Sequence, residues 1–207
     1  MAASQMTECG GEWFMEQKAI TLGGAVWINL ANTIVMQDNQ SVDVLEDPSN
    51  MLQWLEGNGL LEGELTVEPG KASIHYALIL LRNICLEAIT DLHGEGRLSD
   101  QTFSKLAKKS SELIVDVRTE RSNDVPYLIH EGRSSEDRIS YAVLKSLVET
   151  VAQYPPERIR KCEHESCILH FIDTSKSGKR RWCSMDLCGN RQKAADFYAR
   201  QKERSGK

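Results

Sequence analysis

The chain has few of the features that mark membrane or secreted proteins. Its 207 residues contain no run of eighteen or more apolar residues, so we expect no membrane span. The N-terminal segment shows no basic stretch followed by an apolar one, so we expect no secretory signal. These absences favour a cytoplasmic protein, in which cysteine thiols stay reduced.

Motifs of common enzyme classes are also missing. The chain has no Gly-rich phosphate loop, no G-x-S-x-G and no H-E-x-x-H. Its five histidines are scattered, and those before residue 156 show no metal-ligand spacing. We therefore expect no enzyme. Hydrophobic residues make up 41% and charged residues 27%, which are ordinary values for a soluble globular protein.

Charge is divided unevenly along the chain. Residues 156–207 hold 13 Lys and Arg against 7 Asp and Glu, a net +6. Residues 1–155 hold 12 against 23, a net -11. An acidic body followed by a basic end predicts two parts with different roles. The segment "YPPE" from Tyr154 is the best linker, because each proline pushes the residue before it out of helical geometry. We predict domains at 1–153 and 161–207, with a linker at 154–160.

The first domain is predicted to be mainly helical. The segment "GGAVWINLANTIV" reads as a buried helix or a short strand running into one. Asp47 and Pro48 start another helix, which Gly57 or Gly59 ends, and Ser99 caps a third. Apolar residues recur at helical spacing in "KASIHYALILLRNICLEAITDL" and in "SSEDRISYAVLKSLVETVAQ". Alternating residues on either side of "SND" predict a small β-hairpin near residues 115–129.

Four of the six cysteines lie in the last quarter of the chain, as two C-x-x-x-x-C pairs. They are Cys162, Cys167, Cys183 and Cys188. Structural zinc is commonly held by four thiolates supplied as two close pairs, so this spacing predicts one structural Zn²⁺. Two disulfides would need an oxidising compartment, and a catalytic zinc would need an open coordination position. His164 and His170 are the nearby alternatives as ligands.

The order of segments favours a small α+β module that resembles a treble clef. "ILHFIDT" and "KRRWCS" can form a hairpin around "SKSG", and the second cysteine pair leads into a helix that starts near Gly189. Gly189 would let the backbone bend close to the metal. Of the two remaining cysteines, Cys85 lies on an apolar helix face and is expected to be a buried small hydrophobe, and Cys9 has no partner in the pattern.

The predicted final helix has a basic stripe that contains Phe197. Ala194, Ala195 and Tyr198 lie on its other side, which we expect to pack against the hairpin. Clustered basic side chains favour contact with phosphates. The predicted DNA contacts are Lys179, Arg180, Arg181, Lys193, Arg200 and Arg204. Arg191 lies on the alanine side, and the sequence leaves open whether it serves the metal or DNA.

The segment from Arg160 to Gln201 resembles the CGNR zinc finger, a family named after the tetrapeptide at Cys188–Arg191. "FIDTSKSGKRRWCSM" is also similar to the pattern of that family. Its members usually carry a mostly helical ABATE domain in front, whose "LDFVNT" motif is similar to "INLANT" at Ile28–Thr33. This chain has Asn29 where the family usually has Asp. The resemblance implies a bacterial, stress-linked transcription regulator.

Two functions remain open at this stage. In the first, the zinc module binds double-stranded DNA and the helical domain senses a signal or mediates assembly. In the second, the zinc module is a structural or protein-interaction element, which docks on a partner protein or on the acidic body. Self-association or a protein partner fits either hypothesis, and neither involves a membrane.

Overall fold

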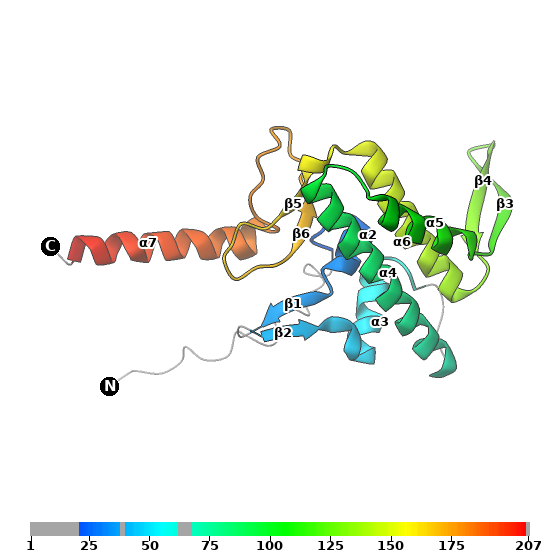
Figure 1. The fold of residues 1–207 in the computed structure, drawn as a ribbon, viewed down its shortest axis with the longest axis horizontal. Helices are drawn as coiled ribbons and strands as arrows, with labels where there is room; N and C mark the ends of the chain where they lie inside the picture. The colour runs from blue at the N-terminus through cyan, green and yellow to red at the C-terminus, as the bar shows by residue number, and fades with distance from the viewer. Residues whose placement is uncertain (1–20, 38–39, 62–67, 206–207) are drawn as a thin grey trace.

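The computed structural model describes residues 21–37, 40–61 and 68–205. Side chains are described over 21–37, 40–61 and 72–202. Helices dominate this part of the chain and are joined by short antiparallel hairpins (Figure 1). The predicted mainly helical fold with a small zinc module is confirmed.

The helices and helical turns follow in chain order: α2 (Val26–Ala31), η2 (Val44–Glu46), α3 (Pro48–Gly57), α4 (Glu68–Gly94), α5 (Asp100–Ser111), α6 (Ser135–Gln153), η3 (Pro156–Arg158), η4 (Met185–Gly189) and α7 (Asn190–Ser205). The strands form the pairs β1–β2 (Ile34–Gln37 and Gln40–Asp43), β3–β4 (Val115–Ser122 and Val125–Gly132) and β5–β6 (Ile159–Lys161 and His170–Ile172).

Side-chain caps set the helix starts where the sequence indicates them. The Asp47 carboxylate accepts hydrogen bonds from the backbone N–H groups of Ser49 and Asn50, at 2.8 and 3.1 Å, and Pro48 opens α3. Ser99 accepts from the N–H of Thr102 at the start of α5. These two predicted starts are confirmed.

Helix α4 is the centre of the hydrophobic core. Trp27 and Leu30 of α2, Trp54 of α3 and Val143 of α6 are all buried in the same cluster as its apolar face. By length and composition, Ala72–Gly94 could cross a membrane. Its apolar stripe is instead buried in this core, which accounts for the composition. Cys85 belongs to the stripe, and burial raises the pKa of its thiol, as expected of a core residue.

The β3–β4 hairpin forms around the predicted turn. Asn123 and Asp124 have φ values of 49° and 63°, so they make a two-residue turn with both residues in the left-handed region. Strand pairing runs in register from Ser122 opposite Val125 to Val115 opposite Gly132. Of the two alternatives for the early segment, the buried helix is confirmed as α2, and no strand precedes it in the described residues. The sequence did not indicate the β1–β2 hairpin that follows it.

The hairpin predicted between the two cysteine pairs is wrong. Strand β6 pairs with β5, which precedes the first cysteine, and residues 179–184 form no strand. The hairpin therefore encloses Cys162 and Cys167 at its turn. The local pattern could not show this, because the strand that pairs with β6 begins inside the segment that we assigned to a linker.

The segment after α6 is ordered and carries part of the core. Helix α6 ends at Gln153, before the two prolines, and η3 and β5 follow directly. Ile159 of β5 and Ile172 of β6 are buried in the same cluster as α4. The boundaries at 153 and 161 stay a prediction, but the two parts share this core.

Candidate metal centre and nucleic-acid interface

The first cysteine pair is held by the turn of the β5–β6 hairpin. Cys162 follows β5, and its N–H donates to the carbonyl oxygen of Leu169 at 2.9 Å. The N–H of Cys167 donates to the carbonyl oxygen of His164 at 2.9 Å, which closes a tight turn. Both sulfur atoms thus come from a short backbone loop whose shape the flanking strands fix.

The second pair lies at the start of the final helix. Cys183 lies at a bend, and Cys188 is in the π-helical turn η4. Ser184 caps this turn by accepting from the N–H of Leu187 at 3.3 Å. A cap between the two cysteines therefore sets where the helix begins and how the Cys188 side chain is presented.

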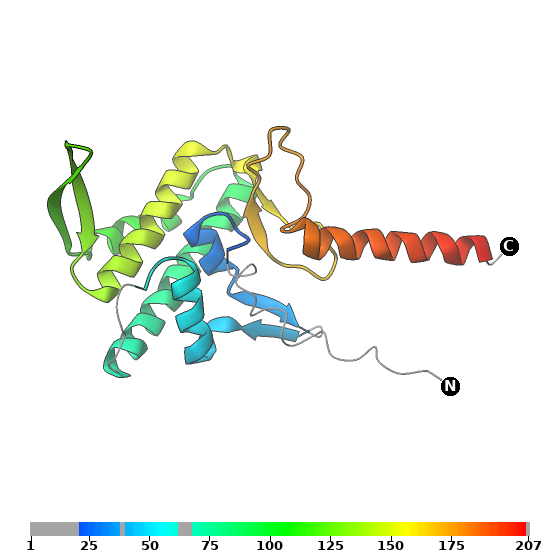
Figure 2. The same ribbon diagram turned by 180° about the vertical axis from the view of Figure 1, so that it is seen from behind.

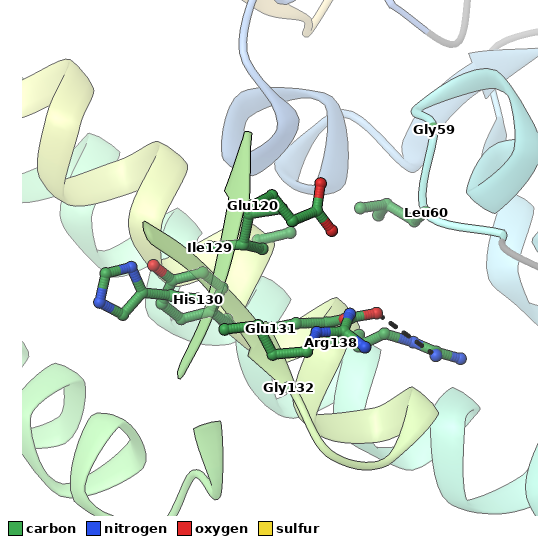
Figure 3. Close-up of a pocket in the computed structure, with 11 residues that line it drawn as sticks. Gly59, Leu60, Glu120, Ile129, His130, Glu131, Gly132 and Arg138 are labelled. Atoms are coloured by element: carbon green, nitrogen blue, oxygen red, sulfur yellow. Dashed lines mark ion pairs between the residues drawn. The ribbon is translucent and has the colours of Figure 1, made fainter. Parts of the chain in front are cut away.

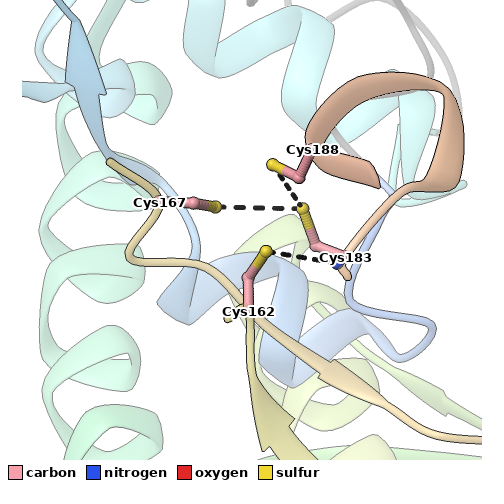
Figure 4. Close-up of side chains that lie close together, drawn as sticks. All are labelled: Cys162, Cys167, Cys183 and Cys188. Atoms are coloured by element: carbon pink, nitrogen blue, oxygen red, sulfur yellow. Dashed lines mark hydrogen bonds between the residues drawn. The ribbon is translucent and has the colours of Figure 1, made fainter. Parts of the chain in front are cut away.

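The four sulfur atoms have the geometry of a closed zinc site (Figure 4). They lie within 4.8 Å of one another, with 3.8 Å from Cys167 Sγ to Cys183 Sγ and 3.6 Å from Cys183 Sγ to Cys188 Sγ. Sulfurs at about 2.3 Å from one zinc ion lie about 3.8 Å apart in a tetrahedron. All four side chains are buried. Within the described residues, this cluster contains neither His164 nor His170.

Four thiols packed this closely cannot all ionise without a cation. Hydrogen bonds from the other cysteines, Cys167 first, lower the pKa of Cys162. The pKa of Cys183 is raised, chiefly by its hydrogen bond to Cys162. Thiolates are the form that binds metal, and a divalent cation supplies the charge that lets all four ionise. The donor set and the geometry fit one structural Zn²⁺.

Two N–H groups, one from the backbone and one from a side chain, donate to the sulfurs. The backbone N–H of Cys183 donates to Cys162 Sγ at 3.4 Å, and Arg191 Nη2 lies 3.7 Å from Cys188 Sγ. Four thiolates and one Zn²⁺ carry a net charge of about -2, which such donors stabilise. The structure thus places the Arg191 guanidinium beside the metal ligands.

Gly189 lies in a closely packed turn and has no positive φ. A Cβ atom there would lie 2.5 Å from Met185 Sδ and 3.1 Å from Trp182 Cδ1. Trp182 is half-buried and packs against the cysteine cluster, so it belongs to the core of the module. Glycine therefore lets η4 approach the indole closely.

The zinc module is attached to the helical domain through "INLANT". The Asn32 side chain donates to the carbonyl oxygen of His170 and accepts from its N–H, both at 2.8 Å. The N–H of Ile172 donates to the carbonyl oxygen of Gly23 at 2.9 Å. Val35 of β1 is buried in the cluster that contains the four cysteines. Asn32 therefore joins the two parts, a role that residue spacing alone did not show.

Asn29 uses both ends of its amide. Its Oδ1 accepts from the N–H of Gly23 at 2.8 Å, and its Nδ2 donates to Asn58 Oδ1 at 2.7 Å. Asn58 Nδ2 in turn donates to the carbonyl oxygen of Trp54 at 2.8 Å. A neutral amide at this position thus ties the loop before α2 to the end of α3.

Models of two known families match the chain. The CGNR zinc finger matches residues 158–201. The ABATE model, described as "Putative stress-induced transcription regulator", matches residues 24–108. The chain combines an ABATE domain with a CGNR zinc finger. This confirms the resemblance read from "INLANT" and "CGNR". No curated protein matches the chain.

Arg180 of the CGNR zinc finger is tied to the backbone of the finger. Its Nε donates to the carbonyl oxygen of Trp182 at 2.9 Å, and its Nη2 donates to that of Cys183. The guanidinium also lies 4.3 Å from the centre of the buried Phe171 ring. These contacts use the donors that a DNA contact would need, so the interface proposed below omits Arg180.

Asp173 is a structural residue that the sequence analysis did not identify. It is fully buried, and its carboxylate accepts from the N–H groups of Ser175 and Arg180, both at 2.9 Å. Burial alone would raise its pKa, but hydrogen bonds from Ser175 and Arg180 keep the pKa below its usual value. The signal was an aspartate directly before the Ser- and Gly-rich turn of the "FIDTSKSGKRRWCSM" motif.

The other predicted DNA contacts differ in their surroundings. Arg181 Nε donates to Glu163 Oε2 at 2.5 Å, and its guanidinium lies 4.7 Å from the Trp182 ring centre. Lys179, Lys193 and Arg200 are exposed. The side chain of Arg204 lies outside the described residues, as do Cys9 and Lys207. Lys193 and Arg200 are the two that lie together on one exposed element, α7.

The alanine side of α7 does not pack against a hairpin. Ala194, Ala195 and Tyr198 are all exposed, and Tyr198 keeps 69% of its surface. Helix α7 extends away from the body of the molecule, in contact with η4 at its base (Figures 1 and 2). The strand expected beneath it is absent from residues 179–184, which leaves both faces of the helix exposed.

A hollow of about 400 Å³ lies between the β3–β4 hairpin and α6 (Figure 3). Arg118, Glu120 and Glu131 from the hairpin and Arg138 and Tyr141 from α6 are among its lining residues. Glu131 forms ion pairs with both arginines. The hollow lies at the opposite end of the helical part from the zinc site.

Proposed function

We propose that this chain is a cytoplasmic transcription regulator whose CGNR zinc finger binds double-stranded DNA through α7. The family description of residues 24–108 supports the regulatory role. Since both matching families are of regulator and zinc-finger types, we assign the chain no catalytic activity. The zinc is structural, because four cysteine ligands leave no open coordination position.

The observation that carries the proposal is the exposed helix α7. Lys193 and Arg200 are exposed, and helical spacing puts them within about 40° of each other and of Arg204. A helix of this diameter fits the major groove, where basic side chains reach phosphates on either side. Lys179 adds exposed positive charge from the loop before the second cysteine pair, and Arg181 adds an exposed guanidinium that is paired with Glu163.

The distribution of charge in the zinc finger also supports α7 as the element that contacts DNA. The net +6 of residues 156–207 falls to about +4 once four thiolates and one zinc ion are counted. Arg158, Arg160 and Arg180 are occupied by contacts within the finger. The positive charge available to DNA is therefore concentrated on α7 and the loop at its base.

The test is fluorescence anisotropy with a random-sequence duplex at several salt concentrations. Each phosphate contact contributes about 0.9 to the slope of log affinity against log salt, so four contacts predict a slope of about -4. Changing Lys193 and Arg200 together to Ala should reduce the slope by about 2 and weaken every sequence alike. The matched control is Lys108→Ala on α5, which removes an exposed lysine at the opposite part of the molecule.

Two exposed aromatic residues favour a second candidate, a protein-docking role for α7. Phe197 and Tyr198 keep 51% and 69% of their surfaces, and no described element covers them. Aromatic residues with this exposure are common anchors of protein interfaces. DNA affinity that is absent at low salt, or that ignores salt, would favour this candidate over the first.

For the helical domain we propose the regulatory input, through a signal or through assembly. The hollow beside Tyr141 and Arg138 is the candidate site for a signal. The β3–β4 hairpin is the candidate site for assembly, because it has exposed apolar side chains and an unpaired strand edge.

A further inference from the structure

The β3–β4 hairpin is a two-stranded ribbon that projects from the helical domain, at the end of the molecule away from α7 (Figures 1 and 2). Each strand has eight residues, and the register is continuous. Among the described residues, the ribbon contacts the rest of the chain mainly at its base near the start of α6, and its Arg118, Glu120 and Ile129 line the hollow beside Leu60 and Tyr141. The outer part of the ribbon is free to meet another molecule.

The ribbon exposes an unusual amount of apolar surface for a solvated hairpin. Val117, Val125 and Leu128 keep 57%, 65% and 60% of their surfaces, and Tyr127 keeps 45%. An isolated two-stranded hairpin is only marginally stable in water, whereas three or more strands with an apolar face are stable. This ribbon therefore gains most from additional strands.

Of the two strands, β3 is the one whose outer edge keeps every backbone N–H and C=O group. Because the turn has two residues, Ser122 and Val125 form a hydrogen-bonded pair, and the pairs alternate along the ladder. The N–H and C=O groups of Val117, Thr119 and Arg121 therefore point away from β4. On the outer edge of β4, Pro126 has no N–H to donate. Strand β3 has no proline, lysine or bulge, so the edge protection that it carries is its charged side chains, Asp116, Arg118, Glu120 and Arg121.

We propose that β3 pairs antiparallel with β3 of a second copy of this chain, about a two-fold axis at Thr119. This register uses the free backbone groups of Val117, Thr119 and Arg121 on both chains. It also places Arg118 opposite Glu120 of the partner subunit, and the symmetry repeats this pair. The two ribbons form one four-stranded sheet.

The charges of the opposing side chains favour this register over the registers with the axis one residue earlier or later. An axis at Arg118 would place two arginines opposite each other, and Asp116 opposite Glu120 of the partner subunit. An axis at Glu120 would place two glutamates opposite each other. Like charges directly opposite in a sheet are unfavourable, and opposite charges are favourable. An axis at Val117 would also oppose unlike charges, Asp116 against Arg118 of the partner subunit, but it pairs residues 115–119, whereas the axis at Thr119 pairs residues 116–122. Thr119 is therefore the position at which free backbone groups and charges are both matched over the greater length of β3.

The proposal deepens the assembly role proposed for the helical domain and does not depend on DNA binding. Its test is the mass of the full chain, zinc-loaded and without DNA, by light scattering and sedimentation up to about 100 μM. The wild-type chain should be a dimer. Thr119→Pro should be monomeric, because it removes an outward N–H and leaves the ladder to β4 intact.

A charge exchange tests the register itself. Arg118→Glu alone places glutamates opposite Glu120 of the partner subunit, and Glu120→Arg alone places arginines opposite Arg118 of the partner subunit. Each variant should dimerise at least about tenfold more weakly than wild type. An equimolar mixture should restore the dimer, because every opposing pair then has opposite charges.

Circular dichroism and zinc content of each variant serve as controls for folding. A wild-type chain that stays monomeric over the whole concentration range would overturn the proposal, and would favour the strand of a different protein as the occupant of this edge. A wild-type dimer that neither charge variant weakens would also overturn it. DNA affinity is measured separately, so failure of the DNA proposal leaves this result unchanged.

Discussion

Individual side chains around the zinc site have roles that residue type alone did not reveal. Arg180 and Arg181 are adjacent and both basic, and the sequence assigned both to DNA. In the structure, the Arg180 guanidinium donates to backbone carbonyls of the finger, and the Arg181 guanidinium pairs with Glu163 on the surface. Sequence spacing identified the four cysteines because the metal imposes a pattern. It could not assign the arginines, because their partners are backbone groups that only the fold brings close.

The first prediction concerns Arg191, whose guanidinium lies beside Cys188 Sγ. Arg191→Ala should weaken zinc binding about 10- to 100-fold, the usual cost of removing an outer-shell donor. Arg191→Lys should retain part of the affinity, because a positive charge remains. Competition with a chromogenic chelator measures the effect. Lys193→Ala on the same helix is the control, and an equal loss in both variants would contradict a specific role for Arg191.

The second prediction concerns the buried Arg82 and its partly exposed partner Asp43. Arg82 Nη1 lies 2.7 Å from Asp43 Oδ1 and 2.9 Å from Thr33 Oγ1, and its side chain is only 7% exposed. Asp43→Asn leaves the guanidinium charge buried without its counter-ion. We expect a loss of about 3–5 kcal/mol in the free energy of unfolding. Asp47→Asn, at an exposed cap, should cost far less, since Asn caps helices equally well.

Asp43 also predicts a pH dependence. Burial alone would raise its pKa, but hydrogen bonds from Arg82 and the Leu45 N–H, with the positive charge of Arg82, lower it below 3.8. A carboxyl with a lowered pKa in the folded state contributes stability at neutral pH that is lost as the pH falls through that value. Acid unfolding below about pH 4 should therefore be less steep in Asp43→Asn than in the wild type. Equal slopes in urea titrations at several pH values would exclude this contribution.

At the scale of elements, the sequence predicted what local chemistry decides. Asp47, Ser99 and the turn at Asn123 and Asp124 appear where caps and turn residues indicate them. It missed what long-range pairing decides. Strand β6 could pair with residues after the turn or before Cys162, and the core contacts of Ile159 and Ile172 accompany the second choice. Exposure of α7 was missed for the same reason, because its predicted support was the strand that does not form.

Helix α7 gives a prediction that separates stability from function. Nearly all of its described side chains are exposed, so they contribute little to the packed core. A chain that ends after Ala194 keeps all four cysteines and should unfold at almost the wild-type temperature. Its salt slope for DNA binding should fall by about 2, because Arg200 and Arg204 are gone while Lys179, Arg181 and Lys193 remain. A large fall in melting temperature, measured with bound zinc verified, would show that α7 packs on the body.

At the scale of the whole molecule, the zinc finger and the ABATE domain share one structure. Ile159 and Ile172 belong to the helical core, Val35 belongs to the cysteine cluster, and Asn32 bonds to β6. Removing zinc should therefore lower the stability of α4 as well as that of the finger. Hydrogen exchange with and without a chelator measures this. Unchanged protection of α4 in the zinc-free chain would mean that the two parts are energetically separate.

The same coupling bears on the segment from Tyr154 to Arg160, which the sequence assigned to a linker. In the zinc-loaded protein this segment forms η3 and β5, so limited proteolysis should spare it. After zinc removal it should become the preferred cleavage site, because β5 loses the hairpin turn that the metal closes.

The central claim is that zinc holds α7 in a position to bind DNA. The most direct measurement is the affinity of the full chain for a duplex at constant low salt, before and after chelation, with zinc content determined in both samples. We predict that removal of zinc weakens binding at least about 100-fold, and that added zinc restores it, because the cysteines no longer fix the loop and η4 at the base of α7. Unchanged affinity in a sample verified to be free of zinc would contradict the account.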